Sequence, residues 1–80
     1  MKRTLHELRD YALSLADDIE FMWNGAHGLI IPYSKNKFIL TFHDPDGPDE
    51  EFHDIDSLLK APLLDGRSLA EVCREVEFLR

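Results

Sequence analysis

Apolar residues recur at helical spacing near the start of the chain. They fall on one side of a helix with about 3.6 residues per turn, at Leu5, Leu8, Tyr11, Ala12, Leu15 and Ala16. Thr4 and Glu7 have the spacing of a capping box, in which each side chain bonds the backbone amide of the other residue. The pattern predicts a helix from about Leu5 to about Asp17.

The pattern changes to a period of two around Asn24-Gly25. Ile19, Phe21 and Trp23 alternate with other residues before this pair, and strand-forming residues follow it up to Ile31. Asn-Gly favours a two-residue type I′ turn, since both central residues need a positive φ. We therefore predict a β-hairpin. The alternative is that residues 19–23 extend the first helix with Asn24-Gly25 as its C-cap, although Phe21 would then face solvent.

A second strand-forming run, residues 38–42, follows Ser34-Lys35-Asn36. A three-residue loop with Asn36 in the left-handed conformation predicts a second hairpin. Its register places Tyr33 opposite Lys37, Ile31 opposite Ile39 and Leu29 opposite Thr41. The next segment, Asp44-Pro45-Asp46-Gly47, suits a type I turn. Residues 51–53 then predict a short fourth strand beside the third.

The last part of the chain predicts two helices. A brief helix over residues 58–61 has Asp56 or Ser57 as its cap and is stopped by Pro62. Ser68 and Glu71 have the spacing of a second capping box. The final helix is expected to extend through Leu79, with an apolar stripe made of Leu69, Val72, Cys73, Val76 and Leu79.

These elements predict a single α+β domain over residues 1–80. We expect a three- to four-stranded antiparallel meander, with the N-terminal helix and the C-terminal helix packed on one face. Because side chains alternate along a strand, the register assigns each residue to a face. The face under the helices collects Ile19, Phe21, Trp23, Ala26, Gly28, Ile30, Phe38, Leu40 and Phe42. The opposite face, which we call the outer face, collects Glu20, Met22, His27, Leu29, Ile31, Tyr33, Lys37, Ile39, Thr41 and His43.

Composition narrows the classes of function. The chain has 16 acidic and 9 basic residues and a net charge of −7, whereas nucleic-acid-binding proteins cluster Lys and Arg to neutralise phosphates. No apolar run approaches the roughly 18 residues that would span a bilayer. We therefore expect neither a nucleic-acid nor a membrane partner. Cys73 is the only cysteine and Met1-Lys2-Arg3 leads directly into the first helix, so a reducing cytoplasm is the expected location.

No arrangement of residues predicts catalysis. The serines lack the context of a nucleophile elbow, and the glycines are scattered singly, without forming a phosphate-binding loop. Cys73 lies on an apolar stripe, where a thiol behaves as a small hydrophobic group. We expect a protein that is not an enzyme and has no cofactor.

Histidines provide an alternative function. The predicted register places His27 opposite His43 on the outer face, and His53 joins them if Phe52 pairs with Phe42. Imidazoles on neighbouring strands about 5 Å apart could bind zinc, with Glu20 or Asp44 as an oxygen ligand. This hypothesis describes a metal-responsive domain.

The outer face also carries a large apolar area, made by Met22, Leu29, Ile31, Tyr33 and Ile39. Such an area is rarely left exposed on a monomer. Either the segment 57–64 folds over it, or a homodimer or another protein covers it. The main hypothesis is therefore a small acidic interaction or regulatory module. Its partner contact would centre on Leu29, Ile31, Tyr33 and Ile39.

Overall fold

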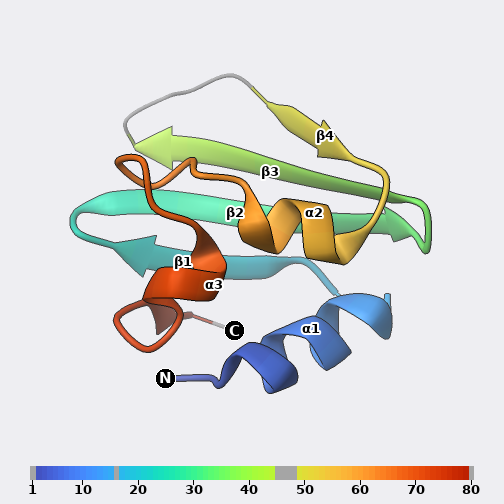
Figure 1. Ribbon diagram of the computed structural model, residues 1–80, viewed down its shortest axis with the longest axis horizontal. Coiled ribbons are helices and arrows are strands. Elements are labelled where there is room, and N and C mark those ends of the chain that lie inside the picture. The colour runs from blue at the N-terminus through green and yellow to red at the C-terminus, as the bar shows by residue number, and fades with distance from the viewer. Residues whose placement is uncertain (1, 16, 45–48, 80) are drawn as a thin grey trace.

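The computed structural model describes residues 2–15, 17–44 and 49–79, and it confirms the α+β fold predicted from the sequence. An antiparallel sheet forms one layer, and the helices form a second layer on one of its faces (Figure 1). The strand order is β4-β3-β2-β1-β5, so β2 is the central strand. In chain order the elements are α1 (Leu5–Leu13), β1 (Ile19–Trp23), β2 (Ala26–Ser34), β3 (Lys37–Asp44), β4 (Glu50–Phe52), α2 (Ile55–Lys60), α3 (Leu69–Val72) and β5 (Glu77–Phe78).

Helix α1 begins at the predicted capping box. The Thr4 hydroxyl accepts a hydrogen bond from the Glu7 amide at 3.1 Å, and the Glu7 carboxylate accepts one from the Thr4 amide at 2.9 Å. The helix ends at Leu13, before the predicted end at Asp17. Leu15 has a φ of 56°, and this left-handed conformation ends a right-handed helix.

The first hairpin forms as predicted, so residues 19–23 are strand β1 and not part of a helix. Asn24 and Gly25 have φ values of 52° and 85°, as a type I′ turn requires. Farther along β2, Gly28 lies opposite Phe21. A Cβ atom at position 28 would overlap the Phe21 ring, so glycine lets this ring lie directly against the β2 backbone.

The second hairpin has the predicted pairing between β2 and β3 but a different loop. The pairs Ile31–Ile39 and Leu29–Thr41 are present. Ser34 pairs with Lys37, however, so the turn has two residues, and the predicted Tyr33–Lys37 pair is wrong. Asn36 does not adopt the expected positive φ. A register shift just before Ser34 leaves Tyr33 in a β-bulge, and this extra residue offsets the shorter loop and keeps the apolar pairs in place.

Strand β4 pairs with β3 in a different register from the one that would bring His53 to the other two histidines. Phe52 lies opposite Phe38 and not opposite Phe42. The two registers place the same side chains on the same face, because Phe38 and Phe42 are separated by an even number of residues. Alternation could not distinguish them. The type I turn predicted over residues 44–47 falls mostly outside the described part of the chain.

The C-terminal segment is the main departure from the predicted elements. Helix α3 ends at Val72, and Glu77–Phe78 form strand β5 beside β1. The Leu79 amide also donates a hydrogen bond to the Glu20 carbonyl at 2.8 Å. A helix extending through Leu79 would leave this edge of β1 without its backbone partners, and would remove Phe78 from the core, where it is 1% exposed.

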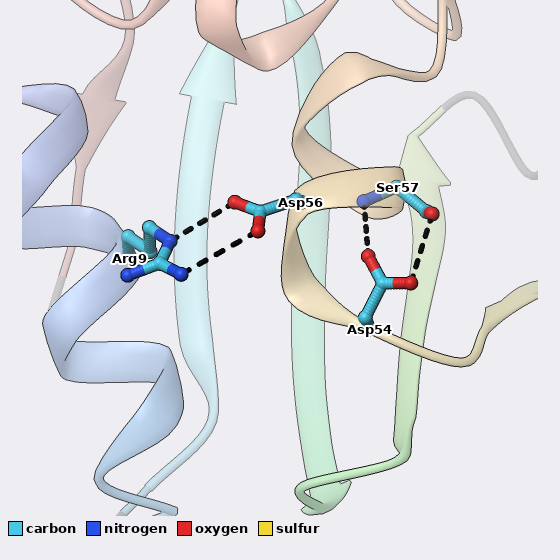
Figure 2. A network of polar contacts seen from close by, with 4 residues as sticks. All are labelled: Arg9, Asp54, Asp56 and Ser57. Atoms are coloured by element: carbon cyan, nitrogen blue, oxygen red, sulfur yellow. Dashed lines mark hydrogen bonds and ion pairs between the residues drawn. The ribbon is translucent and has the colours of Figure 1, made fainter.

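Helix α2 is capped by Asp54 and not by either predicted residue, Asp56 or Ser57. The Asp54 carboxylate accepts hydrogen bonds from the Ser57 amide at 2.7 Å and from the Ser57 hydroxyl at 3.1 Å (Figure 2). Asp56 accepts two hydrogen bonds from the Arg9 guanidinium, at 2.9 and 3.4 Å (Figure 2). The contact between Arg9 and Asp56 joins α2 to α1.

The hydrophobic core lies between the helices and one face of the sheet. Its buried side chains are Leu8, Ala12, Ile19, Phe21, Trp23, Ile30, Phe38, Leu40, Ile55, Leu58, Leu59, Leu64, Leu69, Val72, Cys73, Val76 and Phe78. Because Leu58, Leu59 and Leu64 belong to this core, the segment 57–64 packs on the helical side of the sheet (Figure 1). The segment therefore does not cover the outer face.

Candidate functional site

The outer face of the sheet lies on the side away from the helices of the described chain (Figure 1). Strand pairing places Glu20, Met22, His27, Leu29, Ile31, Ile39, Thr41 and Asp44 on it. The same pairing adds Glu51, which lies opposite Ile39, and Glu77, which lies opposite Met22. Both added residues come from strands whose position the sequence did not predict correctly.

The centre of the outer face is apolar. Leu29 and Ile31 lie on the central strand β2, and Ile39 lies directly opposite Ile31 on β3. Paired residues on neighbouring strands have Cβ atoms about 5 Å apart, and alternate residues of one strand are roughly 7 Å apart. These three side chains therefore form one continuous patch. All three are half-buried by their neighbours in the sheet and remain partly exposed, and Met22 beside them is 36% exposed.

Charged side chains surround this patch and are paired with one another. Glu20 contacts His27 at 2.7 Å between Oε2 and Nε2. Lys37 lies 3.8 Å from Glu51, and Lys2 lies 3.6 Å from Glu77. Exposed ion pairs contribute little to stability, but here Lys37 and Lys2 compensate the charges of Glu51 and Glu77.

Tyr33 lies at the rim rather than at the centre of the predicted contact. Its bulge places it next to Lys37, whose ammonium lies 5.1 Å from the centre of the Tyr33 ring. The Tyr33 side chain is 59% exposed, the largest exposed fraction among the big hydrophobic residues described. An exposed aromatic ring with a polar end is a common contact residue in protein interfaces.

The metal hypothesis required His27, His43 and His53 to share one site, and the side chain of His43 lies outside the described part of the chain. His27 pairs with Asp44 and not with His43, because β2 and β3 shift register between His27 and Gly28. His53 follows β4, whose Phe52 pairs six residues along β3 from Asp44, or roughly 20 Å away at about 3.3 Å per residue. Among the described residues, no group of three or more His, Cys, Asp or Glu side chains could hold a metal ion.

Sequence reasoning missed the rim residues Glu51 and Glu77. A signal for β5 does exist, because the buried residues Val76 and Phe78 alternate with the exposed residues Glu75 and Glu77. This alternation spans too few residues to outweigh the helical stripe that Val76 also fits. For Glu51, no local signal distinguishes the two possible registers of β4.

None of the helices in the described ranges is long and apolar enough to cross a membrane. In comparisons with known proteins, no family model, no curated protein and no solved structure matches this chain.

Proposed function

We propose that this protein is an interaction module that binds another protein chain through the outer face of its sheet. The supporting observation is that Leu29, Ile31 and Ile39 form an apolar patch that no helix of the described residues covers. An antiparallel sheet that faces water usually presents polar residues on that side. An apolar centre within a polar rim is instead the usual anatomy of a protein interface.

The proposal does not involve catalysis. Burial raises the pKa of the Cys73 thiol, which disfavours the reactive thiolate. Ser57 and Ser68 hydrogen-bond at helix N-termini. A cytoplasmic location and a protein partner, rather than nucleic acid, are parts of the same proposal. They are supported by the single cysteine and by the net charge of −7.

The alternative of a metal-responsive domain depended on three neighbouring imidazoles. Because the register separates His53 from His27 along β3, the geometry gives this alternative no support. Interaction through the outer face is the function that the arrangement supports best.

The test uses the tagged protein as bait in a native lysate. The Ile31→Glu variant places a charge at the centre of the outer face and should abolish capture. The Leu5→Glu variant is the matched control, because Leu5 is 39% exposed on α1 and the substitution makes the same change in charge on the helical side. Capture that is equal for Ile31→Glu and the wild type would contradict the proposal, as would no capture together with a strictly monomeric protein.

A further inference from the structure

We propose that the outer face binds a second copy of this chain, so that two sheets pack face to face in a symmetric dimer. This inference rests on the proposed function of the outer face. In a two-fold dimer each chain contributes the same surface. The apolar residues of one copy must therefore pack against the same apolar residues of the other, and the charges of the two copies must not repel one another strongly.

The charges at the rim meet this requirement. Strand pairing places four acidic residues on the outer face, Glu20, Asp44, Glu51 and Glu77. Glu51 and Glu77 each have a lysine partner, and Glu20 contacts the imidazole of His27. A basic foreign partner would have to compete with the lysines and would gain little from these two carboxylates. A second copy would meet a rim in which lysines of the same chain already compensate Glu51 and Glu77.

The size of the outer face fits a weak dimer. The five strands are 5, 9, 8, 3 and 2 residues long. At about 3.3 Å per residue and about 4.8 Å between strands, the face covers roughly 430 Å², which is about half of the ~800 Å² that each partner contributes to a standard interface. Leu29 and Ile31 lie on the central strand, where surrounding contacts can exclude water.

The edges of the sheet favour this arrangement over pairing through edge strands. The two edge strands are β4, with three residues, and β5, with two residues. Such short strands offer few backbone groups to another chain, and short edges are one way in which proteins prevent edge-to-edge association. The face of the sheet is therefore the better surface for a second copy.

The net charge predicts the sign of the salt dependence. Two chains that each carry −7 repel one another at a distance comparable to the shortest dimension of the molecule, 19 Å. Salt screens this repulsion, since the Debye length falls from about 14 Å at 0.05 M to about 6 Å at 0.3 M. The dimer should therefore become tighter, on the order of tenfold, between these salt concentrations. Binding of a basic foreign protein should weaken over the same range.

Sedimentation equilibrium of the purified full chain tests the inference, from about 10 μM to about 1 mM, the range in which interfaces of modest area dissociate. Ile31→Glu and Ile31→Thr should each raise the dissociation constant at least about tenfold, because a symmetric dimer loses the contact twice. Ile31→Thr adds no charge and keeps a β-branched residue in the strand. Leu5→Glu should stay within about twofold of the wild type, because it lies away from the interface. Circular dichroism establishes that each variant is folded.

Three results would overturn the inference. They are a monomer at every concentration and salt, a dimer unaffected by both Ile31 variants, and a dimer that loosens as salt is added. If the protein is a monomer but captures a lysate protein in a manner that depends on Ile31, the inference of a dimer is wrong and the proposed function stands. If it is a monomer and captures nothing, both are wrong.

Discussion

Gly28→Ala should destabilise the protein. This is the opposite of the usual effect, because a strand with alanine is normally more stable than one with glycine by about 0.5–1 kcal/mol. The new Cβ atom would overlap the ring of Phe21 on the paired strand. This ring is 0% exposed. It lies against the rings of Phe42 and Phe78, with centroids 6.2 and 6.4 Å away. The ring therefore has little room to move aside.

The expected magnitude follows from these opposing effects. Overpacking a well-filled core costs about 1–3 kcal/mol, and the gain in strand propensity offsets part of this. The free energy of unfolding should fall by about 1–2 kcal/mol. For a domain of this size, the melting temperature should then fall by roughly 4–16 °C.

Urea denaturation of a double-mutant cycle tests the cause of this loss. Phe21→Leu removes the ring atoms that the Cβ atom would meet, so the double variant should be more stable than the sum of the single effects by about 1 kcal/mol. Additivity within about 0.3–0.5 kcal/mol would show that the two residues do not interact. Stabilisation by Gly28→Ala alone would refute the packing argument.

Three further predictions concern the ends of elements. Phe78→Ala should lower the free energy of unfolding by about 3–5 kcal/mol, because this side chain is 1% exposed and its ring packs against that of Phe21 on β1. A loss below about 1 kcal/mol in urea denaturation would contradict the role of β5. Leu15→Gly should raise the free energy of unfolding by a few tenths to about 1 kcal/mol, since Leu15 has a φ of 56°. A clear destabilisation in urea denaturation would mean that its side-chain contacts outweigh the strain. The hydrogen bond from Arg9 holds the pKa of Asp56 in the folded protein below its usual range. The ionised carboxylate therefore stabilises the fold at pH values above the unfolded pKa of about 4. This stabilisation is lost as the pH falls through the lower pKa of the folded state. Asp56→Asn should accordingly lower the melting temperature at neutral pH and match the wild type in strong acid, and an equal difference at both pH values would refute the linkage.

Features that depend on neighbouring residues could be predicted from the sequence. The capping box at Thr4 and Glu7 follows from side chains three residues apart. The turn at Asn24-Gly25 follows from the ease with which these two residues adopt a positive φ. Together with alternation, they were sufficient for the fold class and for most of the pairing between β1, β2 and β3.

Features that depend on distant residues could not be predicted. Phe52 fits opposite Phe38 or Phe42 equally well by alternation, and only the length and path of the intervening chain select one of them. Val76 fits both a helix stripe and a short strand. The open edge of β1, more than fifty residues earlier in the chain, favours the strand.

The candidate site shows the same division. Its apolar centre of Leu29, Ile31 and Ile39 followed from the register of the second hairpin, because that register was correct in the middle of the strands. The pairs at the rim required the positions of β4 and β5. The exposure of the face required the placement of α2, which depends on how Leu58 and Leu59 fit among the other core side chains.

Strand β5 has a consequence for the order in which the protein folds during synthesis. β1 is synthesised more than fifty residues before its partner Phe78. Until then, we expect the nascent chain to keep one margin of its sheet unpaired and available to other chains. Arrested chains that lack residues 77–79 should therefore be digested by protease within β1, whereas chains that include these residues and are free of the ribosome should resist.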